Sequence, residues 1–105
     1  MERRSGKRIK ASIDARFFYG NLFYSGTVLD LSEKGMYINT RRCLPFESMF
    51  IILIQLENGI LKVIARVKRN VMTDSNCGGL GVELLSPSED YQHFIKGLKK
   101  IQPET

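Results

Sequence analysis

Two groups of residues carry side chains that could bind an anionic ligand. Arg4 and Arg8 lie close together near the N-terminus, so their guanidinium groups are within about 14 Å of each other along an extended chain. Asp30, Ser32 and Gly35 form a second group with the spacing D-x-S-x-x-G. Guanidinium groups make paired, charge-assisted hydrogen bonds, and a carboxylate only accepts them. We expect the two groups to form one ligand site.

The net charge of the chain supports a local anionic site. The chain of 105 residues has a net charge of +5, and its first ten residues hold five basic residues and one acidic residue. The remainder therefore carries a net charge of only +1. A cluster of this kind favours a local anionic partner over a basic surface for nucleic acid. Residues 1–8 have little apolar content, so we expect a flexible basic arm, for which a solvated tail is the simpler alternative.

The remaining residues predict strands that would hold these groups in place. Apolar and polar residues alternate from residue 9 to residue 17, which indicates a strand with one buried face. Further strands are predicted at 22–31, 36–39, 49–56, 60–72 and 80–85, and Asn58-Gly59 is a strong hairpin signal. The nearly continuous apolar run at 49–56 is expected when both faces of a strand are covered. Gly26, inside the second strand, indicates a bulge or a close backbone approach.

The C-terminal residues predict one amphipathic helix over 87–101. We expect Ser86 to cap this helix, with Pro87 at its first position and Glu89 completing a capping box. Tyr91, Phe94, Ile95, Leu98 and Ile101 then follow at helical spacing, so their common face must be buried against the sheet. The fold class is a mainly β, six-stranded antiparallel barrel with one C-terminal α-helix, since closure removes exposed strand edges. Residues 9–105 form a single domain.

The order of these motifs resembles that of a known family, the PilZ domain. Arg3-Arg4-Ser-Gly-Lys-Arg8 is similar to its RRxxxR arm, and residues 26–35 (GTVLDLSEKG) are similar to its G-x-V-x-D-x-S-x-x-G segment. Residues 80–84 (LGVEL) are similar to its last barrel strand. The resemblance covers almost the whole chain and implies a PilZ-like split barrel that binds the bacterial second messenger cyclic di-GMP.

The chemistry of the quoted residues suits that ligand. In the reading that the resemblance implies, Arg4 and Arg8 bind guanine edges and phosphates, and Asp30 accepts from the guanine donors. Ser32 would bind a base or a phosphate of the ligand, and Gly35 would leave the turn open to the ligand. Glycine at residue 35 could also adopt a positive φ without steric cost. Arg3 is a further candidate, because an arginine at that position could support a stacked ligand dimer. Binding would order the arm and change its protein partners, which are not identified.

Two other functions stay open at this stage. A small basic barrel for single-stranded nucleic acid could stack bases on Phe17, Phe18, Tyr19, Phe23 and Tyr24, although we expect core packing for most of these rings. An adaptor of the same fold could contact proteins and ignore nucleotides. The intact arm argues against an adaptor, and the nearly neutral barrel argues against nucleic acid.

Catalysis, metals and membrane insertion have little support in the sequence. His93 is the only histidine, and a site built from Cys43, Cys77 and His93 lacks metal-ligand spacing, so we predict no enzyme, no metal and no cofactor beyond the ligand. No apolar run is long enough to span a membrane, and we expect no signal peptide. We therefore expect a cytoplasmic protein in which both cysteines are reduced, with a disulfide as the minor alternative.

Overall fold

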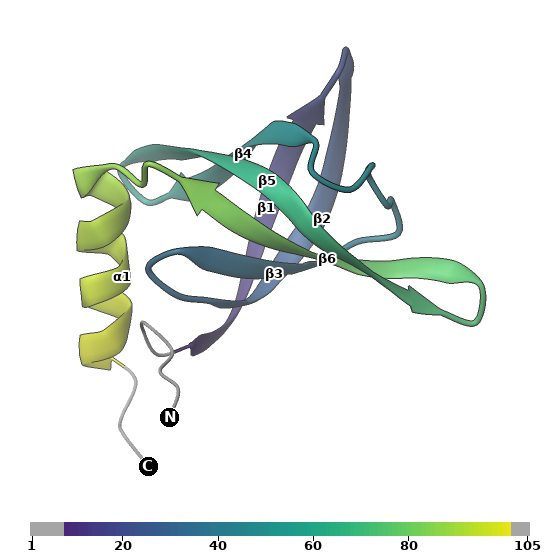
Figure 1. Cartoon of the computed structure of the whole chain (residues 1–105). Coiled ribbons are helices and arrows are strands. Elements are labelled where there is room, and N and C mark those ends of the chain that lie inside the picture. The colour runs from purple at the N-terminus through teal and green to yellow at the C-terminus, as the bar shows by residue number, and fades with distance from the viewer. Residues whose placement is uncertain (1–7, 102–105) are drawn as a thin grey trace.

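The computed structural model describes residues 8–101 and builds them into six strands and one helix. Each strand pairs with its neighbours in antiparallel fashion, and the sheet closes in the order β1-β2-β3-β6-β5-β4 (Figure 1). The predicted fold class is therefore confirmed. The elements are β1 (Ile9–Tyr19), β2 (Leu22–Leu31), β3 (Gly35–Asn39), β4 (Met49–Leu56), β5 (Gly59–Thr73), β6 (Asn76–Leu85) and α1 (Glu89–Ile101).

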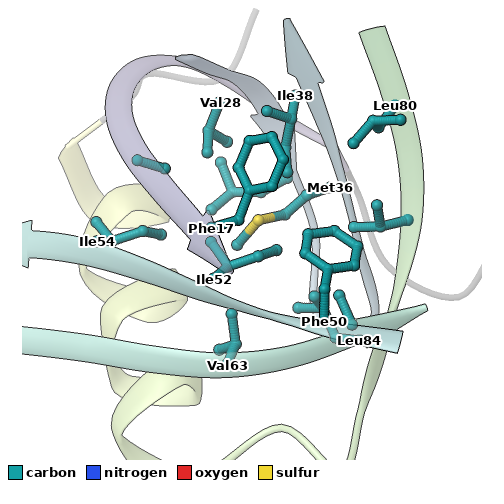
Figure 2. Packing of buried hydrophobic residues seen from close by; sticks show 14 of the residues in the cluster. Phe17, Val28, Met36, Ile38, Phe50, Ile52, Ile54, Val63, Leu80 and Leu84 are labelled. Atoms are coloured by element: carbon teal, nitrogen blue, oxygen red, sulfur yellow. The ribbon is translucent and has the colours of Figure 1, made fainter. Parts of the chain in front are cut away.

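The interior of the barrel is filled by the alternate residues that the period-two pattern assigns to one face. Phe17, Met36 and Ile52 come from three different strands, are fully buried and point toward one another (Figure 2). The ring of Phe17 also lies 5.4 Å from that of Phe50, centroid to centroid, in an edge-on arrangement. Side chains from all six strands thus interdigitate in one core, which holds the strand ends in fixed positions.

Gly26 marks a close approach between strands, one of the two options expected for it. A Cβ atom at this position would lie 2.8 Å from the carbonyl oxygen of Asn39 and 2.8 Å from a methyl carbon of Ile38. The register shift between β2 and β3 falls later, between Val28 and Asp30. Glycine is therefore needed at residue 26 for space, so that β2 and β3 can run into the turn that joins them.

Helix α1 begins at Glu89, and its cap differs from the predicted one. The hydroxyl of Ser88, and not that of Ser86, accepts a hydrogen bond from the backbone N–H of Tyr91 (3.1 Å). Ser86 instead has a positive φ of 49° and belongs to the bend that connects β6 to the helix. Two serines flank Pro87, and only the conformation of the bend decides which of them lies one residue before the helix. Helix α1 is too short and too polar to cross a membrane.

The two cysteines form a disulfide between Cys43 and Cys77, so the expectation of two free thiols is wrong for this structure. The sequence separates them by 34 residues, but the sheet brings their segments together. Asn39 at the end of β3 pairs with Gly79 of β6, and Cys77 precedes Gly79 by two residues in β6. The disulfide therefore ties the β3–β4 loop to the β5–β6 hairpin.

The outer face of the barrel is less covered than the sequence indicates. In β4, Phe50, Ile52 and Ile54 are buried, whereas Ile51 and Leu53 on the opposite face remain partly exposed. The expectation that both faces of this strand are covered is therefore wrong within the described chain. The aromatic residues divide similarly, because Phe17 is fully buried while Phe23 keeps 56% of its surface exposed.

Candidate functional site

Strand pairing brings the start of β1 next to the turn between β2 and β3. Ile9 pairs with Leu31 and Lys10 with Asp30, so Arg8, one residue earlier, lies opposite the turn. Figure 1 shows this turn and helix α1 on the same side of the barrel. Antiparallel pairing of the first two strands is thus enough to bring the last arginine of the arm to the D-x-S-x-x-G segment.

The guanidinium group of Arg8 contacts both polar side chains of that segment. Its Nη2 lies 2.6 Å from Oδ1 of Asp30, and its Nη1 donates to Oγ of Ser32 at 3.4 Å. The Arg8 and Asp30 side chains keep 46% and 31% of their surface exposed, so a ligand could reach them from solvent. Oδ1 of Asp30 is itself buried, and within residues 8–101 this ion pair is the one interaction found for it.

The turn is held by its own backbone and by β6. The N–H of Ser32 donates to the carbonyl of Gly35 (2.9 Å), and the N–H of Lys34 donates to Oγ of Ser32 (3.4 Å). The carbonyl of Lys34 accepts from the N–H of Leu84 in β6 (2.8 Å). Ser32 is buried, with only 7% of its surface exposed. These contacts orient its hydroxyl toward Arg8.

Gly35 lies in a tight space and does not adopt a left-handed backbone. Within the described residues, the glycines with positive φ are Gly20 and Gly59, so the expected use of positive φ at Gly35 is not seen. A Cβ atom at residue 35 would lie 3.0 Å from the carbonyl oxygen of Val82 and 3.3 Å from Nη1 of Arg8. A side chain would therefore displace either the sheet or the guanidinium group. The glycine leaves room for Arg8 against the turn.

Tyr91 of helix α1 anchors the turn between β2 and β3 through a hydrogen bond to its backbone. It was not among the predicted site residues. Its hydroxyl donates a 2.6 Å hydrogen bond to the backbone carbonyl of Ser32, and its side chain is fully buried. Burial raises the pKa of this hydroxyl well above its ordinary value, and the positive charge of Arg8 opposes that rise only in part. A tyrosine in an otherwise apolar helical stripe was the available signal, since a buried tyrosine hydroxyl needs a polar partner.

Replacing Tyr91 by phenylalanine is expected to lower the free energy of unfolding by about 1–3 kcal/mol near neutral pH, because the buried carbonyl of Ser32 loses its donor. Unfolded tyrosine ionises near its ordinary pKa of 10.0, whereas folded Tyr91 stays neutral. The stabilisation is therefore complete below that pH and is lost as pH rises toward the raised pKa. Urea unfolding should show a difference in the free energy of unfolding between the parent and Tyr91→Phe that is smaller at about pH 11 than at about pH 7. A difference independent of pH would contradict this role.

The structure brings together four of the six predicted site residues, namely Arg8, Asp30, Ser32 and Gly35. Arg3 and Arg4 lie outside the described residues. No three His, Cys, Asp or Glu side chains within residues 8–101 lie close enough together to hold a metal ion. His93 lies on an exposed part of α1 and takes no part in the site.

These features define a class of protein: a small closed β-barrel in which the start of the first strand, the turn between β2 and β3 and the C-terminal helix meet at a charged site. The chain belongs to the PilZ family, because the PilZ domain model matches residues 2–99. PilZ domains are receptors for cyclic di-GMP and are generally not catalytic. No significant relative was found among curated proteins.

Solved structures support the same fold at low sequence identity. The PilZ domain of YcgR from Escherichia coli with cyclic di-GMP has a TM-score of 0.73 and 20% identity, covering 94% of this chain and 93% of that one. The inhibitor of motility MotI/DgrA from Bacillus subtilis has a TM-score of 0.76 and 18% identity, and the match covers 97% of this chain and 52% of that one. The MrkH–cyclic di-GMP complex from K. pneumonia has a TM-score of 0.69 and 16% identity, and the match covers 93% of this chain and 51% of that one. This chain spans about half the length of MotI and MrkH.

Proposed function

We propose that this domain binds cyclic di-GMP through Arg8, Asp30, Ser32 and Gly35, together with Arg4 and with Arg3 as a further contact. The observation that carries the proposal is the Arg8 guanidinium held 2.6 Å from Asp30 and 3.4 Å from Ser32, beside a glycine that leaves space for it. Guanine has O6 and N7 as acceptors for an arginine and amino donors for a carboxylate. The phosphates suit the remaining positive charge of the arm.

The ion pair between Arg8 and Asp30 can be rearranged by a ligand that supplies replacement contacts. Both side chains are partly solvated, but Oδ1 of Asp30 is buried, so breaking the pair without a replacement would leave that atom without a partner. A guanine that accepts from Arg8 and donates to Asp30 would replace this pair by two charge-assisted contacts, which are stronger than neutral hydrogen bonds. The pair thus holds both groups near the geometry that the ligand needs.

The proposed mechanism is ordering of the N-terminal arm on the barrel. The turn, held by Leu84 and Tyr91, supplies a rigid half, and the arm supplies the half that closes over the ligand. The contacts with the ligand must exceed the entropy lost by the arm. Closure would create a new surface and change which protein the domain contacts. The proposed cytoplasmic location rests on the proposed ligand, cyclic di-GMP. The Cys43–Cys77 disulfide does not support this location, because disulfides are more frequent in oxidising compartments.

Calorimetric titration of the purified chain is expected to show binding of cyclic di-GMP, and much weaker binding of cyclic di-AMP and GTP. Adenine has an amino donor where guanine has the O6 acceptor, so it would place a donor against Arg8. GTP lacks the second base and the ring closed by two phosphodiesters. Equal affinity for all three would indicate unspecific attraction to the basic arm, and no binding of cyclic di-GMP would refute the proposal. Binding of single-stranded DNA with a steep salt dependence would support the nucleic-acid alternative.

A further inference from the structure

We propose that the outer face of β2, β1, β4 and β5 is a docking surface for an amphipathic helix of another protein, with acidic residues along one edge of that helix. These four strands are consecutive neighbours in the barrel. The proposal is independent of the nucleotide site and stands whether or not the domain binds cyclic di-GMP.

A row of apolar side chains crosses this face at right angles to the strands. Phe23 of β2 is opposite Phe18 of β1, Phe18 is opposite Ile51 of β4, and Ile51 is opposite Ile64 of β5. The rings of Phe18 and Phe23 are 3.9 Å apart, centroid to centroid. Phe23 and Ile64 are 56% and 43% exposed. The row is therefore continuous and open to solvent.

Exposed apolar residues extend beyond the row on this face. Among the large hydrophobic residues that are exposed in the described chain, Met49 and Ile60 lie here besides Phe23 and Ile64. The residues of the row are neighbours in the sheet, and contiguous exposed apolar surface of this kind marks interaction sites in soluble proteins. An open groove of about 680 Å³ lies beside the row, and its lining includes Phe23, Leu53 and Ile60 together with one acidic residue, Asp14, and one basic residue, Arg16.

Helix α1, the one helix in residues 8–101, cannot cover this surface because its apolar face is already used. Tyr91 and Ile95 are buried in the barrel core, and Tyr91 is further tied to Ser32. The apolar residues Ile51 and Leu53 on the outside of β4 thus have no partner element in the described chain. This explains why β4 has the sequence of a strand covered on both faces while the structure covers only one.

The shape of the surface selects a helix over a strand. A closed barrel has no free backbone edge to which a partner strand could add, so recognition must use side chains. Neighbouring strands are about 4.8 Å apart, and one helical turn rises about 5.4 Å. Because the sheet curves into a closed barrel, a helix lying across the strands would place apolar residues on neighbouring positions of the row, one turn after another.

The charges beside the apolar row indicate which edge of the partner helix should be acidic. Arg16 is opposite Leu53, which in turn is opposite Lys62, so a row with two cations runs parallel to the apolar row. Within the part of the chain that the structure describes, neither cation makes an ion pair. On the far side, Met49, Arg66 and Glu83 form a mixed row in which Arg66 pairs with Glu47. Acidic residues are therefore favoured on the edge that faces Arg16 and Lys62.

Selection from a displayed library of 16-residue helices tests the proposal directly. Each member carries leucine once per turn on one face and random residues along both edges, and the probe is the purified full chain without nucleotide. The expected result is enrichment of Glu and Asp along one edge only. Binding of the enriched peptides should weaken at least tenfold in Ile64→Lys and in Arg16→Glu. The matched control, Met72→Lys, alters an apolar residue of the β5–β6 hairpin that is more exposed than Ile64 (56% against 43%) and should change affinity less than twofold.

Four results would contradict the proposal. The first is failure to enrich any helix, and the second is binding that Ile64→Lys and Arg16→Glu leave unchanged while all variants melt as the parent does. The third is self-association of the chain that Ile64→Lys abolishes, as measured by sedimentation, since the occupant would then be a second copy. Enriched peptides with lysine and arginine on the edges would likewise contradict the charge argument.

Discussion

Replacement of Arg8 by alanine is expected to weaken cyclic di-GMP binding by about 1–3 kcal/mol, which is roughly a 5- to 150-fold rise in Kd. Arg8 is the one residue of the arm whose contacts the structure describes, and it bridges Asp30 and Ser32. Its loss removes the donor fork for guanine O6 and N7 and also the cation that holds Asp30. Calorimetric titration of both proteins measures the effect.

A matched control distinguishes the specific contact between Arg8 and the ligand from general electrostatic attraction of the ligand to a basic protein. Arg41→Ala removes the same charge from an exposed arginine outside the site, and its affinity should stay within about twofold of the parent. Asp30→Ala is the sharper comparison, because removing a negative charge would strengthen a purely electrostatic attraction to a dianion. The proposal expects it to weaken binding by a similar 1–3 kcal/mol or about 5- to 150-fold, since the acceptor for guanine is lost. Equal effects of Arg8→Ala and Arg41→Ala would contradict the site.

Replacement of Phe17 by alanine is expected to lower the free energy of unfolding by about 3–5 kcal/mol. Phe17 is fully buried in the centre of the barrel, where its ring lies 5.4 Å from Phe50 and 5.6 Å from Tyr24 (Figure 2). These rings come from three strands and cannot close the cavity without moving the sheet. Guanidinium or urea unfolding measures the change as a shift in midpoint at constant slope.

The control for Phe17 is another phenylalanine that is not buried. Phe46 keeps 63% of its surface exposed, so Phe46→Ala should change the free energy of unfolding by less than about 0.5 kcal/mol. Comparable losses in the two variants would show that Phe17 is not at the centre of the core. A Phe17→Ala protein that no longer unfolds cooperatively would support the expected effect, because it indicates that the remaining stability is small.

The strands and the pairing at the site could be predicted because they depend on local patterns. Alternation from residue 9 to residue 17 and the Asn58-Gly59 turn define strands and hairpins without knowledge of the rest of the chain. Consecutive antiparallel strands then place the start of the first against the end of the second. The neighbourhood of Arg8, Asp30 and Ser32 follows from this rule alone, and the structure agrees.

Other features depend on residues that are distant in sequence, and there the sequence was silent or misleading. The cysteines have no local spacing that indicates a disulfide, and only the pairing of β3 with β6 brings Cys43 and Cys77 together. The choice between Ser86 and Ser88 as helix cap depends on a bend with positive φ. Tyr91 belongs to an amphipathic stripe, and nothing near it in sequence indicates that its hydroxyl reaches Ser32.

The sequence by itself therefore determined which segments form strands, the buried face of the first strand and the two halves of the proposed site, because side-chain period and turn chemistry act over a few residues. The tertiary structure decided which carbonyl Tyr91 anchors, how little space residue 35 has beside Arg8 and Val82, and that the outer face of β4 stays open. These depend on closing the barrel, since closure sets the distances between segments that no local pattern relates.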